Sequence, residues 1–256
     1  MASKFSSVKL SAPPNPASIG DQTARGLVWL TMNTVLQKCV SIGVQLVLAW
    51  WLAPDDFGLI GLAYTVAAFG VLLQLTGMRD VLVHRSTSLR RWSNPAFWIS
   101  ASSGTFAALA MLAIAPFAAA AYDSPRLTGL IVPVAMTTVV TALSMVPLAR
   151  LQAELRFRDH ANVLLIDTIG TGALTVAMAY LGMGAYCFVL PRLITSFVQG
   201  LLVWSIAPVR VRMNMQFRRW PFLLGDVFKL VAASAFFTAA IQIDRLALGP
   251  VSYTHL

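Results

Sequence analysis

Charged residues, and acidic residues above all, are scarce in this sequence. Only 11% of its 256 residues are charged and ten are Asp or Glu, whereas 57% are hydrophobic. A soluble domain has about 25% charged residues, because water must wet its surface. The shortage excludes a surface covered by water alone and indicates that lipid covers much of the protein.

Cysteine and histidine are also rare, and this excludes several kinds of site. Cys39 and Cys187 stand inside apolar runs, and the chain has three histidines. Disulfide frameworks and metal sites need more of these residues at fixed spacings. The sequence has neither a His-Glu-x-x-His motif nor the Gly-Lys pair of a phosphate-binding loop, which excludes a metalloprotease and a built-in ATPase. We expect no metal and no cofactor.

The basic residues give a net charge of +9, but they do not form a basic face with aromatic residues among them, so nucleic acid is not an expected partner. They stand in short clusters between apolar runs, as in membrane proteins. Seven of these runs are long enough for a helix to span a bilayer, which takes about 20 residues. We predict membrane spans at 26–51, 57–78, 96–121, 128–149, 161–181, 184–207 and 222–248.

The distribution of charge predicts the orientation of the spans. Residues 1–24 and the links after the second, fourth and sixth runs hold nearly all the basic residues that lie outside the spans. The opposite links hold Arg126 beside Asp55, Asp56 and Asp123. The positive-inside rule therefore places the N-terminus in the cytoplasm. Residues 1–24 lack the apolar core of a signal peptide and are rich in Ser, Pro and Ala, so we predict a disordered cytoplasmic tail.

Two of the basic links mix Arg with aromatic residues, in the segments RRWSNPAFW (90–98) and RMNMQFRRWPF (212–222). This composition is typical of segments that lie at the membrane interface beside anionic headgroups. The alternative is that the arginines only anchor the topology. The link Leu148–His160 alternates charged residues with Leu and Phe, which favours a short amphipathic helix.

The residues near the C-terminus repeat the end of the first span. IQIDRLALGP (241–250) parallels QLVLAWWLAP (45–54), and such a repeat indicates two similar halves, as in many transporters. The second half would begin near residue 222. After Pro250 the repeat stops at VSYTHL, which matches one reading frame of the transposase adapter used in DNA library preparation. We therefore expect residues 251–256 to be a sequencing-adapter artefact and the chain to be a C-terminally truncated fragment.

Several segments carry a family resemblance, namely GLVWLTMN, LAPDDFGLIGLA, LLQLTGMRDVLVHR, VPLARLQAELRFRDHA and MGAYCFVLPRLI. In this order they resemble the polysaccharide transporter family of O-antigen and exopolysaccharide flippases, within the multidrug/oligosaccharidyl-lipid/polysaccharide exporter superfamily. The resemblance runs over about residues 20 to 250. It implies an all-α polytopic membrane protein with two six-helix lobes. Residues 25–210 would form the N-terminal six-helix lobe, and residues 211–250 would begin the C-terminal lobe.

The same resemblance implies the function. Such transporters move an undecaprenyl-pyrophosphate-linked oligosaccharide from the inner to the outer leaflet of the bacterial inner membrane by alternating access, in the biosynthesis of lipopolysaccharide and other surface polysaccharides. The implied partners are the lipid-linked glycan, membrane lipids, and a glycan polymerase with its export machinery.

Ionisable residues inside the spans predict the site, because a charge at a helix centre costs about 2.5–3.5 kcal/mol on insertion scales. Lys38 stands in the first span, Asp167 in the fifth and Arg192 in the sixth. Each shares a helix face with other polar residues: Thr34, Ser41 and Gln45 with Lys38, Thr171 and Thr175 with Asp167, and Thr195, Ser196 and Gln199 with Arg192. We expect these faces to line one shared interior.

We predict that Lys38 and Arg192 bind the substrate pyrophosphate, helped by Thr34, Ser41, Gln45, Thr195 and Gln199. Asp167 would be a counter-charge or an ion-coupling site. The alternative is a structural ion pair, or side chains that snorkel to the membrane surface.

Other functions stay open at this stage. A multidrug exporter or a peptidoglycan-precursor flippase would share the superfamily, although the basic charges at mid-span favour an anionic substrate. A membrane glycosyltransferase is less favoured, because the sequence lacks the Asp-x-Asp motif that such enzymes commonly use. A structural assembly protein would not need charged residues at mid-membrane depth. We therefore do not expect an enzyme.

Overall fold

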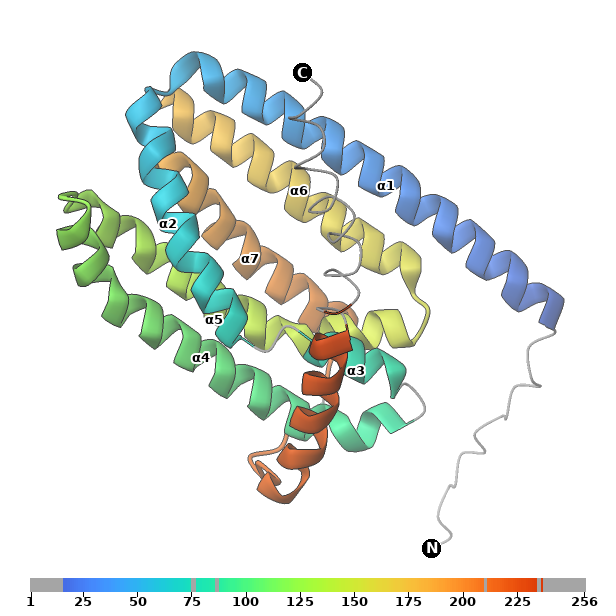
Figure 1. Cartoon of the computed structure of the whole chain (residues 1–256). Coiled ribbons are helices and arrows are strands. Elements are labelled where there is room, and N and C mark those ends of the chain that lie inside the picture. Colours follow the sequence, from blue (N-terminus) through green and yellow to red (C-terminus); the bar gives the residue numbers. More distant parts are fainter. Residues whose placement is uncertain (1–15, 75–76, 86–87, 210, 234–235, 237–256) are drawn as a thin grey trace, which may run out of the picture.

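All regular elements that the structure describes are helices (Figure 1). This computed structural model describes residues 16–74, 77–85, 88–209, 211–233 and 236. The elements are α1 (Pro16–Trp51), α2 (Pro54–Leu73), α3 (Met78–His84), α4 (Leu89–Ala121), α5 (Arg126–Ala153), α6 (Phe157–Tyr180), α7 (Tyr186–Ile206), the 3-10 helix η2 (Phe217–Arg219) and a helical segment over 220–233.

Five of these helices are long and apolar enough to cross a membrane, which confirms the prediction of an all-α polytopic membrane protein. The stretches are Thr31–Trp51, Arg91–Ala121, Arg126–Ala153, Phe157–Tyr180 and Tyr186–Ile206. The second predicted span corresponds to the 20-residue α2, which is not among the five. Much of the seventh predicted span, the repeat at 241–250 and the expected artefact at 251–256 lie outside the described residues.

Helix α1 begins earlier than the sequence suggested. It starts at Pro16, so residues 16–24 belong to a helix and not to the predicted disordered tail; residues 1–15 lie outside the described residues. Proline suits the first turn of a helix because its φ is already fixed near the helical value. Adding turns to a helix that has already formed costs far less than starting one, so a polar composition did not prevent the extension.

The link Leu148–His160 does not form the short amphipathic helix that its pattern favoured. Helix α5 continues to Ala153 and α6 begins at Phe157. Leu155, with φ of 56°, reverses the chain between them, and the Arg156 amide N donates to the Leu151 carbonyl at 3.0 Å. This is a Schellman closure with leucine where glycine is usual. The amphipathic pattern came from two helix ends that meet.

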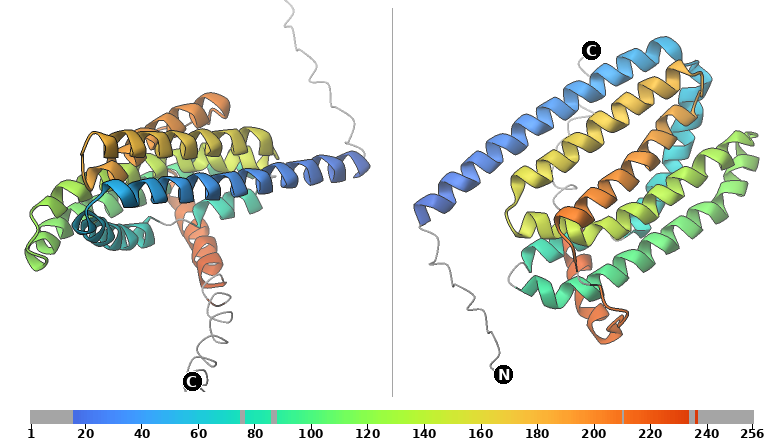
Figure 2. Two further views of the ribbon diagram at one scale, coloured as in Figure 1. Left: turned by 90° about the horizontal axis from the view of Figure 1, so that it is seen from above. Right: turned by 180° about the vertical axis from the view of Figure 1, so that it is seen from behind.

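The long helices lie side by side in the order α1, α6, α7, α5 and α4, and α2 crosses α4 and α5 (Figures 1 and 2). Because α4, α5, α6 and α7 reverse direction from one to the next along the chain, the first residues of α4 and α6 meet the last residues of α5 and α7 at one end of the bundle, which we call the basic end. Arg91, Arg150, Arg156, Arg212 and Arg219 all lie there.

The start of α2 gives a structural reason for the sequence Pro54-Asp55-Asp56. Pro54 begins the helix, and Asp55 and Asp56 follow in its first turn, where a carboxylate is favourable near the positive end of the helix dipole. The Asp56 carboxylate also lies against the turn before α7, because a Cβ added to Gly184 would be 3.1 Å from Asp56 Oδ1. These aspartates therefore stabilise the start of α2.

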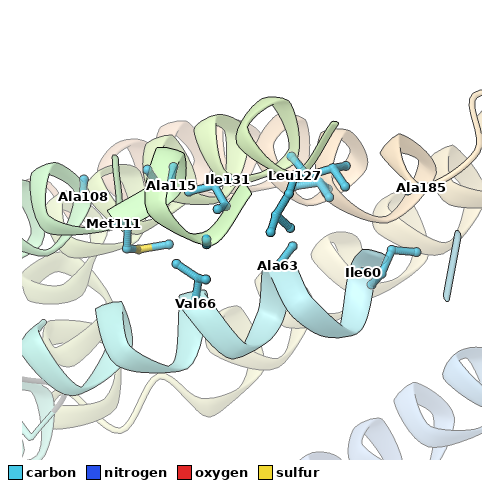
Figure 3. Packing of buried hydrophobic residues seen from close by; sticks show 13 residues of the cluster. Ile60, Ala63, Val66, Ala108, Met111, Ala115, Leu127, Ile131 and Ala185 are labelled. Atoms are coloured by element: carbon cyan, nitrogen blue, oxygen red, sulfur yellow. The ribbon is translucent and has the colours of Figure 1, made fainter. Parts of the chain in front are cut away.

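The largest hydrophobic core joins α2 to α4 and α5. Ile60, Ala63 and Val66 follow one face of α2 and pack against buried residues that include Met111 of α4 and Ile131 of α5 (Figure 3). Their spacing of three residues keeps them on one helix face. This core holds α2 across the pair α4–α5.

A second core holds the segment 220–233 at the basic end. Leu223 and Val227 are buried with Met78 and Leu82 of α3 and with residues of α4 and α5. Asp226 adds an ion pair with Arg85. The segment that follows α7 is therefore packed firmly against the preceding helices.

Candidate functional site

Most of the polar residues predicted inside the spans line one cavity. The cavity has a volume of about 400 Å³ and lies between α1, α6 and α7, with one residue from α2. We call it the mid-span cavity. The predicted residues that line it are Lys38, Ser41, Gln45, Asp167, Thr171, Thr175 and Arg192. The interior shared by three polar helix faces is thus present in the folded chain.

Some predicted binding residues lie elsewhere. Among the described residues, Thr34, Thr195 and Gln199 do not line the mid-span cavity. Thr34 is exposed. Thr195 is buried, and its Oγ1 lies 2.8 Å from Thr171 Oγ1, so it joins α7 to α6. Gln199 is half-buried one turn further along α7. The helical repeat correctly placed these residues on the polar faces of α1 and α7. The cavity, however, covers only part of each of these faces.

The charged centre of the cavity is an ion pair between α6 and α7. Arg192 Nη1 donates to Asp167 Oδ2 at 2.6 Å. The Asp167 side chain is 9% exposed and the Arg192 side chain is 45% exposed. The structure therefore places Asp167 as the buried counter-charge of Arg192, while the guanidinium itself remains open to the cavity.

The second carboxylate oxygen of Asp167 has an unusual environment. Oδ1 is buried and has no hydrogen-bond partner within the part of the chain that the structure describes. A buried charged oxygen without a partner carries a desolvation cost of about 1–3 kcal/mol or more.

Lys38 supplies the second positive charge, from the opposite wall. It is exposed on α1, whereas Arg192 lies on α7, and both line the mid-span cavity. Arginine offers five N–H donors in a planar fork, and lysine offers three donors on a flexible stem. A ligand between them would meet cationic donors on two sides.

Three further polar residues that line the cavity were absent from the sequence prediction. Gln37, Tyr64 and Thr168 also line the cavity. Tyr64 comes from α2, and its signal was a polar side chain within an otherwise apolar run. Gln37 also donates from Nε2 to Asn33 Oδ1 at 2.8 Å, and Asn33 Nδ2 donates to the Ala161 carbonyl at 2.7 Å. This relay ties α1 to the start of α6.

The chain offers little for metal or disulfide chemistry. Among the described residues, no group of three or more His, Cys, Asp or Glu side chains could hold a metal ion. Cys39 and Cys187 are both free. The chemistry of the cavity therefore consists of charge, hydrogen bonds and shape.

In the part of the chain that the structure describes, five helices are long and apolar enough to cross a membrane, and three of them line a cavity with charged walls. These features define a multi-pass membrane protein with a polar interior site. The sequence profile of a family described as polysaccharide biosynthesis protein matches residues 47–254. The chain belongs to this polysaccharide biosynthesis protein family, which confirms the resemblance drawn from the sequence. No curated protein and no solved structure matches the chain significantly. The family supports a transporter-type role in polysaccharide biosynthesis.

Proposed function

We propose that this chain belongs to a transporter that moves a lipid-linked oligosaccharide from the inner to the outer leaflet of the bacterial inner membrane. The observation that carries the proposal is the mid-span cavity, where Lys38 and Arg192 face a shared space from α1 and α7. Among the described residues that line the cavity, these two cations stand against one carboxylate, that of Asp167. This excess of positive charge suits the pyrophosphate group that links such glycans to their lipid.

The ion pair supports a sequence of events on binding. Asp167 holds Arg192 through an ion pair. A pyrophosphate that enters competes for the guanidinium, because phosphate oxygens accept its paired donors in a bidentate arrangement. The carboxylate then loses part of its counter-charge and takes up a proton or a cation. Substrate binding and ion uptake would thus be linked through one pair of residues.

The orientation follows from the two ends of the bundle. The basic end carries arginines from three links, whereas the opposite end carries Asp55, Asp56 and Asp123 with Arg126. We place the basic end and the N-terminus in the cytoplasm, in keeping with the positive-inside rule. A lipid-linked glycan made on that side would enter there, and a glycan polymerase and export machinery would act after its release.

Two rival functions share the superfamily. A multidrug exporter selects cations and would present an unpaired carboxylate, but Asp167 is paired with Arg192. A peptidoglycan-precursor flippase would also bind a pyrophosphate, so the cavity charge alone does not separate it from the proposed function. We do not propose an enzyme.

Complementation tests the proposal. The full-length protein is expressed in cells that lack their own transporter for the glycan, and surface glycan is measured together with lipid-linked intermediates. Lys38→Ala and Arg192→Ala should each lower export about 10- to 100-fold, because one charge-assisted hydrogen bond contributes about 1.5–3 kcal/mol.

The matched control is Arg126→Gln, which removes one exposed positive charge at the opposite end of the bundle. It should export at the wild-type level. Normal export by both cavity variants at normal expression would refute the anion-binding role. Export of a lipid-linked peptidoglycan precursor and not of the oligosaccharide would identify the rival flippase.

A further inference from the structure

A second and larger cavity lies at the basic end of the bundle. It has a volume of about 1010 Å³ and is formed by the start of α4, the end of α5 and the link after α7. We call it the basic-end cavity. Its lining includes the arginines Arg91, Arg150, Arg212 and Arg219. Among the described residues that line it, Glu154 is the one carboxylate.

The link after α7, which the structure describes over 207–209 and 211–219, is fixed to α4 on one side of this cavity. Asn94 Nδ2 donates to the Asn214 carbonyl at 2.6 Å, and the Arg212 amide N donates to Asn94 Oδ1 at 2.8 Å. Trp98 Nε1 donates to the Arg212 carbonyl at 2.9 Å. Asn94 is only 7% exposed. The backbone of Arg212 is therefore held at both its amide and its carbonyl, which places this arginine at the cavity wall.

The other side is braced by Arg150 and Arg219. Arg150 Nη1 donates to the Pro208 carbonyl, and its Nε donates to Glu154 Oε1 at 2.6 Å. Arg219 Nη1 lies 3.0 Å from the Arg91 carbonyl and 2.7 Å from Gln216 Oε1. Because Glu154 is already paired with Arg150, no lining carboxylate within the described residues remains to balance the other arginines.

The position of the cavity matches the depth of lipid headgroups. The apolar stretch of α4 begins at Arg91 and that of α5 ends at Ala153, so the cavity lies where two spans leave the membrane. Trp92 lies beside it, with the guanidinium of Arg219 at 5.9 Å and that of Arg85 at 4.5 Å from the ring centre. Tryptophan is enriched at this level of the bilayer.

We propose that the basic-end cavity binds the phosphate-bearing headgroup of a lipid in the adjacent leaflet, which is the inner leaflet on the orientation proposed above. Basic pockets between membrane helices on the cytoplasmic side are suited to anionic headgroups. Topology anchoring alone would need positive charge but neither a cavity nor the clamp on Arg212. The site is separate from the mid-span cavity, so this inference stands whether or not the proposed transport is correct.

Native mass spectrometry of the purified full chain tests this inference by measuring bound lipid during titration. The probes are phosphatidylglycerol, undecaprenyl pyrophosphate and, as the zwitterionic comparison, phosphatidylcholine. The variant is the double substitution Arg91→Gln/Arg212→Gln, since both side chains are exposed. It should weaken the tightest binding event for an anionic lipid on the order of tenfold.

The control variant is Arg158→Gln/Arg218→Gln, which removes the same charge from exposed arginines at the basic end that do not line the cavity. It should change the affinity less than twofold. Preference for phosphatidylglycerol would identify a resident phospholipid as the ligand, and preference for undecaprenyl pyrophosphate would identify the lipid carrier. Equal losses in both variants, or equal binding of phosphatidylcholine, would overturn the proposal.

Thermal unfolding of each variant in detergent guards against a folding defect. Should the double variant fail to fold, Arg212→Lys keeps the charge and removes the planar fork, and it should weaken anionic lipid binding less than Arg212→Gln. Equal affinity of these two single variants and the unchanged chain would also overturn the proposal.

Discussion

The helix pairs α4–α5 and α1–α6 solve the packing problem in opposite ways. In the apolar stretch of α5, 44% of the residues are buried, whereas in the apolar stretch of α1 only 11% are buried. The α4–α5 contact relies on small residues, so that a Cβ added to Gly104 would lie 2.3 Å from the Ala142 Cβ. The α1–α6 seam instead contains the mid-span cavity and the relay through Asn33. Thus α4 and α5 form a tightly packed pair, whereas α1 and α6 form a less buried pair with polar groups between the helices.

The largest expected effect concerns the ion pair at the polar seam. Arg192→Ala leaves the Asp167 carboxylate buried without its counter-charge, and this should lower the free energy of unfolding by about 3 kcal/mol. The double variant Asp167→Asn/Arg192→Ala removes both charges and should recover much of this loss. Denaturation of the unchanged protein, of Asp167→Asn, of Arg192→Ala and of the double variant in one detergent completes the mutant cycle. Additive losses would mean that the two residues do not interact.

The second-largest effect is expected at the tightly packed contact between α4 and α5. Gly104→Ala forces α4 away from α5 and should destabilise the protein by about 1–3 kcal/mol, as overpacking does. Gly43→Ala makes the same substitution in α1, where a Cβ meets nothing within 4 Å, and it should be neutral or slightly stabilising. The melting temperatures of the two variants give the comparison directly. Equal shifts would contradict the difference between the pairs.

A smaller effect is expected at the relay that ties α1 to α6. Asn33→Ala removes the bond to the Ala161 carbonyl and should cost about 1–2 kcal/mol, because a buried acceptor loses its partner. Thr65→Ala is the control, since its hydroxyl bonds to the Gly61 carbonyl of its own exposed turn. Hydrogen exchange at the first turns of α6 would report the loss. Unchanged exchange in Asn33→Ala would contradict a stabilising relay.

The smallest effect lies outside both pairs, at Leu155. Leucine in a left-handed conformation carries a steric cost of roughly 1–2 kcal/mol, and this side chain is 59% exposed, so little packing offsets it. Leu155→Gly should therefore raise the free energy of unfolding by up to about 1 kcal/mol. Ala153→Gly, inside the last turn of α5, should lower it instead. A loss of stability in both variants would show that the Leu155 side chain makes a contribution that its exposure hides.

Local patterns predicted helices at five of the spans, and they predicted the charged residues of the mid-span cavity. Apolar runs place helices because lipid covers them, and the helical repeat puts Lys38 with Ser41 and Gln45 on one face. The ion pair followed from placing Asp167 and Arg192 in the fifth and sixth spans, although the sequence left its role open. These features depend on residues that are close along the chain or on adjacent helices.

The features that the sequence did not predict depend on distant contacts. Tyr64 reaches the mid-span cavity only because α2 crosses the bundle. The basic-end cavity exists because the link after α7 folds back onto Asn94, which is more than a hundred residues earlier. The starts of α1 and α4 were placed too late, because an apolar run marks the part of a helix inside lipid and not the turns that extend into water.

Asn94 and Trp98 bind residues 212–214 of the link after α7, and this has a mechanical consequence. A connection of this length would usually be a flexible linker between α7 and the helical segment that follows. Here hydrogen bonds hold the link to α4. The segment over 220–233 is held against α3 by the burial of Leu223 and Val227 and by the ion pair between Arg85 and Asp226. The connection therefore couples α4 to the helical segment over 220–233, so that a tilt of α4 would also move that segment.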